Sequence, residues 1–210
     1  MSFYQRVLRD RLFRTSGRRA KFLASCAVGM DVLDVGVVMH DVQAYLRPDW
    51  LHRHVAAVAK SCLGIDRDEV GIAALLEKGF NVRLADACDL ELGDLTFDVI
   101  MAGDVLEHLD NLAGFCRGAR KYLRPGGRLI IATPNPWWWV RFVQAAMGRV
   151  RNNPEHTIWL SPDTAAELLS RFGFVVDHVV WGSDVGWLYR VPAPGLTRHT
   201  SFYLSAHAVR

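Results

Sequence analysis

Short apolar runs typical of buried strands alternate with helical patterns between residues 32 and 132 of this chain. The runs that we expect to form strands are residues 32–36, 62–66, 82–86, 97–103 and 128–132, and the helical patterns cover residues 50–59, 70–78 and 112–123. Strands linked by helices form parallel sheets with right-handed crossovers and with helices on both faces. The order therefore predicts a doubly wound α/β fold built on a mostly parallel sheet.

A different pattern follows residue 135. Helices are expected at about 138–147 and 162–171, and the apolar segments 174–180 and 201–207 are typical of a closing pair of strands. With 210 residues, 50% of them hydrophobic and 22% charged, the chain suffices for one well-buried domain and hardly for two. We therefore expect a single domain over residues 1–210, with a helical leader at about residues 1–30.

Signals for membrane insertion and export are not found in the sequence. No run approaches the ~18 consecutive apolar residues of a membrane span, and the first residues, MSFYQRVLRDRLFR, lack the apolar centre of a signal peptide. The four cysteines are scattered singly, which favours reduced thiols over disulfides or a zinc site. We expect a cytoplasmic protein without a membrane span.

The net charge of +3 is unevenly distributed, because residues 1–21 carry seven basic side chains and one acidic side chain. Such a segment can attract phosphates or an anionic polymer. We favour the alternative, a solvated amphipathic helix whose apolar side covers the sheet. Nucleic acid is therefore not expected as a partner.

Acidic residues follow the carboxyl ends of successive expected strands: Asp34, with Gly36 beside it, then Asp66, Asp86 and Asp104. Ligands of open α/β sheets bind at this edge. Carboxylates there can hold ribose hydroxyls or an amino nitrogen, while a glycine admits a ligand close to the backbone. Turn preferences explain one such acid more readily than four in series, so we expect a ligand-binding cleft at this edge.

The last of these acids opens the sequence DVLEH, in which Asp104, Glu107 and His108 can bind a metal or exchange a proton. If residues 105–108 open a helix, the three side chains lie within one turn and can converge on a single point. The alternative gives the two acids a role at the start of a helix and makes His108 a metal-free general base.

Five stretches carry a resemblance to a known family. They are VLDVG at 32–36, LGID at 63–66, ADA at 85–87, FDVI at 97–100 and LRPGGRL at 123–129. In this order, over roughly residues 30–135, the chain resembles the class I S-adenosylmethionine-dependent methyltransferases. The resemblance implies S-adenosylmethionine as the cofactor and a seven-stranded sheet whose last strand is antiparallel.

The resemblance also implies which residues contact the cofactor. It places Asp34 and Gly36 at the methionine end, Asp66 at the ribose hydroxyls, and Asp86 with Ala87 at the adenine. The full set of expected cofactor contacts is Asp34, Gly36, His40, Asp66, Arg67, Asp86, Ala87 and Gly103.

One departure from the family pattern lies in the loop after the first strand. Where the family continues D-x-G-x-G-x-G, this chain has Val38 and His40 in the second and third glycine positions. A β-branched residue rarely adopts positive φ, and Val38 adds bulk where the cofactor passes. Either the loop takes another path or cofactor affinity has been lost. His40 faces the cofactor's carboxylate or has a structural role at a helix start.

Asp104, Glu107 and His108, taken together with the distant His156, are similar to the metal site of the small-RNA terminal 2′-O-methyltransferases. The resemblance implies that these four residues bind a divalent cation, Mg²⁺ or Mn²⁺. A cation on a hydroxyl oxygen lowers the pKa of that hydroxyl and fixes its orientation. Glu107, His108 and His156 are therefore the expected catalytic residues, as ligands or as a base.

Six of the seven tryptophans lie after residue 136. In the family, segments after the fourth and fifth strands form the substrate lid, which implies that residues of about 136–200 form the acceptor site. Aromatic faces stack on sugar rings or bases. The expected acceptor contacts are Trp137, Trp138, Trp139 and Trp159. The alternative is that these tryptophans cover the core or form a homodimer contact.

The whole chain is similar to bacterial, mycobacterial-type sugar O-methyltransferases. That resemblance implies methyl transfer to a hydroxyl of a small carbohydrate or oligosaccharide, with the 1-hydroxyl of a methylated mannoside in polysaccharide biosynthesis as the nearest specific acceptor. The alternatives are an RNA ribose 2′-O-methyltransferase and a quinone or phenol O-methyltransferase. From another class, a non-catalytic cofactor-binding scaffold protein also fits the altered glycine loop.

Overall fold

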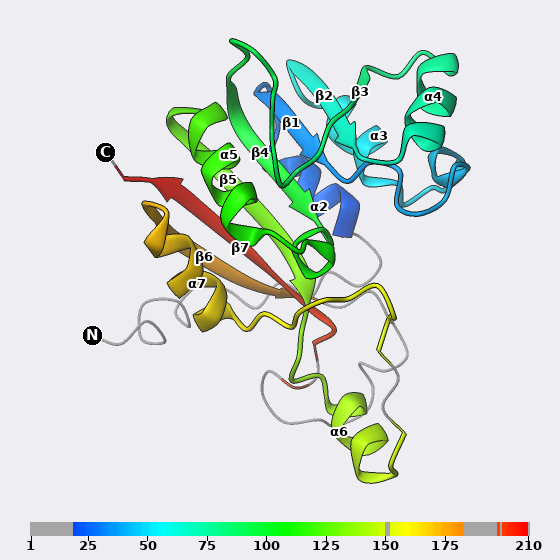
Figure 1. Cartoon of the computed structure of the whole chain (residues 1–210), viewed down its shortest axis with the longest axis vertical. Coiled ribbons are helices and arrows are strands. Elements are labelled where there is room, and N and C mark those ends of the chain that lie inside the picture. Colours follow the sequence, from blue (N-terminus) through cyan, green and yellow to red (C-terminus); the bar gives the residue numbers. More distant parts are fainter. Residues whose placement is uncertain (1–18, 150–151, 183–196, 198, 210) are drawn as a thin grey trace.

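A seven-stranded sheet organises the computed structural model, which describes residues 19–149, 152–182, 197 and 199–209 (Figure 1). The strands are β1 (Asp31–Val35), β2 (Ser61–Asp66), β3 (Val82–Leu84), β4 (Phe97–Gly103), β5 (Leu123–Pro134), β6 (Phe174–Gly182) and β7 (Ser201–Ala208). Their spatial order is β3-β2-β1-β4-β5-β7-β6. Strands β1 to β5 pair in parallel, while β7 is antiparallel to both β5 and β6. The predicted single-domain fold and its antiparallel last strand are confirmed.

Helices cover both faces of the sheet (Figure 1). They are α2 (Arg19–Ser25), α3 (Leu51–Ala56), α4 (Glu69–Glu77), α5 (Leu112–Tyr122) and α7 (Pro162–Arg171). Helix α6 (Trp139–Ala146) lies away from the sheet (Figure 1), and η1 (Ala44–Leu46) and η2 (Leu106–His108) are short 3₁₀ turns. Phe115 of α5 and Leu169 of α7 belong to the core on one face, and Leu23 of α2 and Val55 of α3 belong to the core on the other. Strands buried on both faces must be apolar at nearly every position, which explains why they were visible in the sequence.

Two segments differ from their expected structure. Residues 106–108 form the 3₁₀ turn η2 instead of opening a helix, and α5 begins only at Leu112. Strand β5 begins at Leu123, five residues before the expected start, and includes Gly126 with a φ of 81°. Its pairing with β4 is irregular between Phe97 and Val99. The expected leader falls largely on residues 1–18, outside the described part of the chain, and only α2 represents it.

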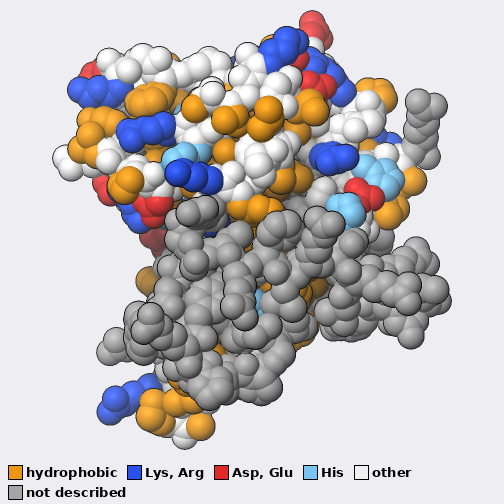
Figure 2. Space-filling model, turned by 180° about the vertical axis from the view of Figure 1, so that it is seen from behind, with side chains coloured by type: hydrophobic (Ala, Val, Ile, Leu, Met, Phe, Trp, Pro, Cys, Tyr) orange, Lys and Arg blue, Asp and Glu red, His pale blue; other side chains and the backbone are white. Residues whose placement is uncertain are grey.

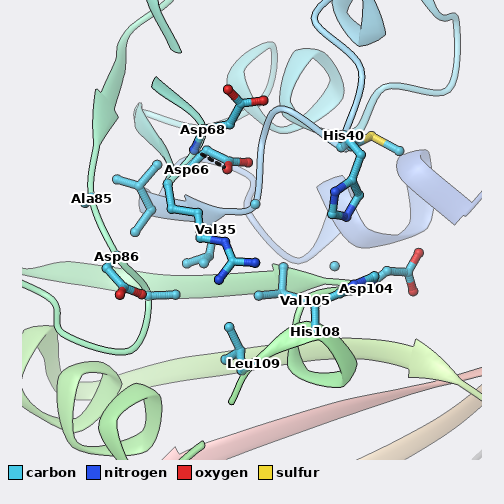
Figure 3. A pocket seen from close by; sticks show the side chains of 16 residues that line it. Val35, His40, Asp66, Asp68, Ala85, Asp86, Asp104, Val105, His108 and Leu109 are labelled. Atoms are coloured by element: carbon cyan, nitrogen blue, oxygen red, sulfur yellow. Dashed lines mark hydrogen bonds between the residues drawn. The ribbon is translucent and has the colours of Figure 1, made fainter. Parts of the chain in front are cut away.

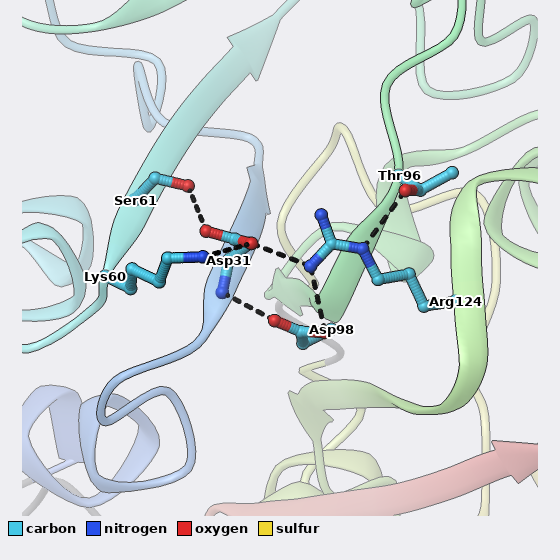
Figure 4. A network of polar contacts seen from close by, with 6 residues as sticks. All are labelled: Asp31, Lys60, Ser61, Thr96, Asp98 and Arg124. Carbon is cyan, nitrogen blue, oxygen red and sulfur yellow. Dashed lines mark hydrogen bonds and ion pairs between the residues drawn. The ribbon is translucent and has the colours of Figure 1, made fainter.

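A charged network ties the amino ends of four strands, β1, β2, β4 and β5, together at the edge opposite the expected ligand cleft (Figure 4). Arg124 Nη1 lies 2.7 Å from Asp31 Oδ2 and 3.0 Å from Asp98 Oδ1. The backbone N–H of Asp31 donates to Asp98 Oδ2 at 2.9 Å, and Ser61 Oγ donates to Asp31 Oδ1 at 2.8 Å. The Arg124 guanidinium and the Ser61 hydroxyl hold the pKa of Asp31 well below its usual range. This network fixes the sheet and lies away from the chemistry.

Among the described residues, no helix is long and apolar enough to cross a membrane.

Candidate functional site

A cleft of about 230 Å³ opens at the carboxyl ends of β1 to β4 (Figure 3). Its lining includes seven of the eight expected cofactor contacts, namely Gly36, His40, Asp66, Arg67, Asp86, Ala87 and Gly103. Gly36 has a φ of 83°, and a Cβ built on it would lie 2.5 Å from Val105 Cγ2. Only glycine therefore suits this turn, which brings bare backbone to the cleft.

Asp66 shapes the loop that follows β1. Its Oδ2 accepts a hydrogen bond from the Val38 N–H at 2.9 Å, and its Oδ1 accepts one from the Asp68 N–H at 3.1 Å. A carboxylate oxygen can accept a second bond, so both oxygens keep acceptor capacity toward the cleft. Asp86 lies exposed on the neighbouring strand end, where its Oδ1 accepts a bond from the Cys88 N–H at 2.8 Å.

The glycine loop takes a path of its own. Val38 is buried, and its side chain occupies the space beside Gly71 of α4, where an added Cβ would lie 2.3 Å from Val38 Cγ1. The left-handed conformation instead falls on Met39 and His40, with φ of 55° and 56°. Of the two alternatives that the sequence left open, the changed path is therefore the one observed. A glycine inside a helix was the available sequence signal of this close approach.

His40 points into the cleft instead of starting a helix (Figure 3). Its Nδ1 lies 3.1 Å from Glu155 Oε2, and its ring centroid lies 4.9 Å from that of His108. One ligand atom from each of these three residues lies within 4.8 Å of the others. A contact between His40 and the cofactor's carboxylate stays a prediction.

The contact between Asp34 and the methionine end of the cofactor stays a prediction. Asp34 is not part of the cleft lining, because its carboxylate is buried and its Oδ2 lies 3.0 Å from His52 Nδ1. It borders a second hollow of about 630 Å³, which shares Gly36, Gly103 and Asp104 with the first cleft. The sequence did not reveal His52, since its spacing from Asp34 follows no motif.

Glu107, His108 and His156 come together as expected, with one ligand atom from each within 4.8 Å of the others. We call these residues the cation triad. Glu107 is 1% exposed, and Thr133 Oγ1 donates to its Oε2 at 3.1 Å. Burial, followed by the nearby negative charge of Asp104, raises the pKa of Glu107 to about 8.

The segment that carries His156 is fastened to η2 by its next residue. The Thr157 N–H donates to Glu107 O at 2.8 Å, and Thr157 Oγ1 donates to Leu109 O at 2.8 Å. The rings of His108 and His156 meet edge to face, with centroids 4.7 Å apart. Burial lowers the pKa of both imidazoles. Repulsion from His40 adds to the lowering at His108, and repulsion from His108 and Arg141 adds to it at His156, so the neutral forms are favoured.

Asp104 lies outside the group of three whose ligand atoms lie within 4.8 Å of one another, and its role as a fourth ligand stays a prediction. Its Oδ2 forms an ion pair with Arg19 of α2, and the residue has a left-handed φ of 56°. Its backbone N–H donates to Ala132 O at 2.8 Å. Because Arg19 lies 85 residues before Asp104 in the chain, sequence spacing could not reveal this partner.

The four expected tryptophans lie in different environments. Trp159 lies beside the triad, with its ring centroid 5.4 Å from that of His156 and with Arg141 Cζ 3.9 Å from its centroid on one side. Trp137 stacks against Trp181 and packs on the core, which fits the alternative interpretation for this residue. Trp138 and Trp139 are half-buried at the start of α6. Acceptor contacts stay a prediction.

Comparison with known sequences agrees with this geometry. The family model described as a methyltransferase domain matches residues 3–179. The chain belongs to the methyltransferase domain family. A probable S-adenosylmethionine-dependent methyltransferase of Mycolicibacterium smegmatis is 32% identical over 60% of this chain and 48% of its own length. The mitochondrial ubiquinone biosynthesis O-methyltransferase of Rattus norvegicus is 30% identical over 97% of this chain and 59% of its own length.

Solved structures show the same fold in other methyltransferases. An S-adenosylmethionine-dependent methyltransferase from Mesorhizobium loti aligns with a TM-score of 0.60 and 21% identity, over 88% of this methyltransferase domain and 95% of its own chain. Another from Archaeoglobus fulgidus aligns with a TM-score of 0.63 and 20% identity, over 90% and 89% of the two chains. The chain spans about half the length of the curated mycobacterial relatives that it matches. Together with the sheet order, these similarities identify the class I methyltransferase fold.

Proposed function

We propose that this methyltransferase domain transfers the methyl group of S-adenosylmethionine to a hydroxyl oxygen of a small carbohydrate, with a divalent cation held by the cation triad. The observation that carries the proposal is the convergence of Glu107, His108 and His156 next to the cleft that the strand-end carboxylates line. The 1-hydroxyl of a methylated mannoside is the specific acceptor that we propose, and it rests on the sequence resemblance.

The cleft suits S-adenosylmethionine. The bare backbone at Gly36 leaves room for the cofactor chain, and the remaining acceptor capacity of Asp66 suits two ribose hydroxyls. Ala87 leaves apolar surface beside Asp86 for a flat ring. These residues would bind and orient the donor, which supplies the methyl group. Methyl transfer then depends largely on holding an acceptor oxygen in line with that group.

The triad suits a divalent cation. Glu107 Oε1, His108 Nδ1 and His156 Nδ1 are buried atoms for which no hydrogen-bond partner is found among the described residues. One carboxylate and two imidazoles form a donor set that suits Mn²⁺ and Zn²⁺ better than Mg²⁺. A bound cation would lower the pKa of an acceptor hydroxyl and orient its oxygen. Thr133 fixes the Glu107 carboxylate, and Thr157 fixes the segment that carries His156.

Trp159 supports a carbohydrate acceptor. Its indole lies next to His156 at the triad, and an indole packs well on the apolar C–H faces of a sugar ring. Arg141 covers one side of that indole and thereby fixes its orientation. On this proposal, residues 136–149 and 152–182 contribute to the acceptor side of the site, and most of the remainder of the expected segment, up to residue 200, lies outside the described residues.

A phenol or quinone hydroxyl is the second candidate acceptor. It is favoured by the similarity to the Rattus norvegicus ubiquinone biosynthesis O-methyltransferase, which extends over 97% of this chain. A phenol ionises more readily than a sugar hydroxyl, so His108 or His156 could remove its proton without a cation. Dependence on a cation therefore separates the two candidates.

The experiment begins with calorimetry, in which S-adenosylmethionine should bind to the purified chain. No binding would refute the enzyme, and binding without methyl transfer to any acceptor would favour a non-catalytic cofactor-binding scaffold protein. Methyl transfer is then measured with methylated mannosides, catechols and RNA ends, each with chelator and with added Mn²⁺. We expect transfer to a mannoside that chelator abolishes and Mn²⁺ restores. Glu107→Gln should remove this activity, while Glu77→Gln on the exposed end of α4 serves as the matched control. Transfer only to catechols would overturn the carbohydrate proposal.

A further inference from the structure

Helix α6 presents its apolar side outward. No residue of α6, all of which the structure describes, is buried. Phe142 and Val143 are 55% and 44% exposed, and Met147 at the carboxyl end of the helix is 59% exposed. Met147 follows Val143 by four residues, about one helical turn, and Phe142 is the residue next to Val143, so the three side chains lie on adjoining parts of the exposed helix surface. We call Phe142, Val143 and Met147 the α6 apolar face.

The polar side of α6 faces the protein. Arg141 Cζ lies 3.9 Å from the Trp159 ring centroid, and Arg141 Nε donates to Asn135 O at 3.3 Å. Burial lowers the pKa of the Arg141 guanidinium. A surface helix of a globular protein ordinarily has the opposite arrangement, with its apolar stripe on the core. The contacts of Arg141 therefore hold the helix in an inverted orientation.

Helix α6 lies at an extremity of the molecule, where an extended surface such as a membrane can reach the α6 apolar face. Figure 1 shows α6 beyond the carboxyl end of β5 and well separated from the sheet. Figure 2 shows hydrophobic side chains with a basic side chain beside them at this extremity of the molecule. The cleft opens at the carboxyl ends of the same parallel strands, so α6 projects from the side of the molecule on which the candidate site lies.

We propose that the α6 apolar face inserts into the interface of an anionic lipid surface. Three features favour lipid over a protein partner. Trp138 and Trp139 lie half-buried at the amino end of the helix, and indoles are enriched at membrane interfaces. Arg149, exposed just after the helix, can contact anionic headgroups. The segment combines an amphipathic helix with an exposed basic residue, Arg149, after its carboxyl end, and amphipathic helices with basic residues lie in the plane of membrane interfaces.

The basic amino-terminal sequence adds to the charge argument. Residues 1–21 carry seven basic side chains and one acidic side chain, and the whole chain has a formal net charge of +3. Attraction of basic residues to an anionic surface adds to the gain from burying apolar side chains. The proposal does not depend on which acceptor the site uses or on whether a cation binds.

Vesicle flotation tests this proposal with the full chain. We expect the protein to float with phosphatidylcholine vesicles containing about one third phosphatidylglycerol, and to bind pure phosphatidylcholine vesicles several-fold less tightly. Phe142→Ser and Met147→Ser, made separately, should each lower binding to the anionic vesicles by roughly five- to tenfold. Val70→Ser is the matched control, because Val70 is 70% exposed on α4, and it should leave binding unchanged.

Three results would overturn the proposal. The first is that the wild-type chain does not float with the anionic vesicles. The second is that neither Phe142→Ser nor Met147→Ser reduces flotation. The third is that Val70→Ser reduces flotation as much as these two substitutions do. Sedimentation velocity in the absence of vesicles identifies the competing occupant. A dimer that Phe142→Ser dissociates, together with no flotation, would assign the α6 apolar face to a second copy of the chain. Neither result would alter the test of methyl transfer, which is made with soluble acceptors.

Discussion

Arg19 and Asp104 form an ion pair that joins α2 to the end of β4. The pair leaves Asp104 outside the cation triad, although Glu107 and His108 follow it within four residues. The charge of Asp104 still acts on the site, because it contributes to the raised pKa of Glu107. Asp104 therefore acts on the triad through its negative charge and through its ion pair with α2. Glu107 is the carboxylate that we propose as the ligand of a cation.

The first prediction separates the roles of these two acids. Asp104→Asn should change the Kd for Mn²⁺ less than about threefold, because Asp104 lies outside the cation triad, whereas loss of a ligand costs at least about tenfold. Titration calorimetry with Mn²⁺ measures the Kd of the Asp104→Asn variant and that of the Glu107→Gln variant. Equal losses of affinity in the two variants would return Asp104 to the ligand set.

The pH dependence of cation binding follows from Glu107. Because the pKa of Glu107 is about 8, the carboxyl is mostly protonated at pH 7 and must release its proton to bind a cation. His108 and His156, whose pKa values are lowered, are already neutral there and release few protons. Mn²⁺ affinity should therefore rise between pH 6 and pH 8, approaching tenfold per unit.

Calorimetry in two buffers of different ionisation enthalpy checks this prediction. Close to one proton should be released per Mn²⁺ at pH 7, and Glu107→Gln should abolish the release. A release of two or more protons would mean that the histidines are charged in the free protein. Release of none would mean that Glu107 is already ionised.

The contact between Val38 and Gly71 predicts a non-additive pair of substitutions. Gly71→Ala places a Cβ 2.3 Å from Val38 Cγ1 and should lower the free energy of unfolding by about 1–3 kcal/mol, although alanine is the better helix former. In Gly71→Ala/Val38→Ala the smaller side chain makes room. The free energy of unfolding of the double variant, measured by urea unfolding, should be about 1–3 kcal/mol higher than the sum of the two single effects predicts. Strict additivity would show that the two residues are not in contact.

Much of this fold was predictable because buried parallel strands leave uninterrupted apolar runs in a sequence. The expected strand 97–103 is β4 itself, and each strand-end acid lies at the carboxyl edge. His156 could be assigned to the site from a resemblance, and the structure brings it to His108. These features depend on local periodicity or on motifs, which the sequence records directly.

The parts that could not be predicted are contacts between distant residues. Nothing in the sequence pairs Arg19 with Asp104, or His52 with Asp34, because each contact depends on how helices pack on the sheet. The altered glycine loop is a further case. The substitution of Val38 was evident, but its compensation by Gly71 lies in another helix.

Acid stability is expected to depend on the network at the opposite edge of the sheet. The pKa of Asp31 is lowered in the folded state, chiefly by hydrogen bonds from Arg124 and Ser61. Its stabilising effect is therefore present above the unfolded pKa of about 3.9 and is lost as the pH falls below it. Urea unfolding of the wild-type chain should show a midpoint that declines between about pH 5 and pH 3.

Asp31→Asn should flatten that decline, since the substituted side chain cannot titrate, and its midpoint at pH 6 should already be lower. Asp94→Asn, a substitution at an exposed loop position, should keep the slope of the wild-type chain. If Asp31→Asn showed the full wild-type slope, the acid sensitivity would have to come from other carboxylates.

The cation triad is tested most directly by electron paramagnetic resonance of the wild-type chain with one equivalent of Mn²⁺. Two imidazole ligands should appear as ¹⁴N hyperfine coupling, and His108→Asn and His156→Asn should each remove one of the two couplings. A Mn²⁺ spectrum without nitrogen coupling in the wild-type chain, indistinguishable from the hydrated ion, would contradict the account.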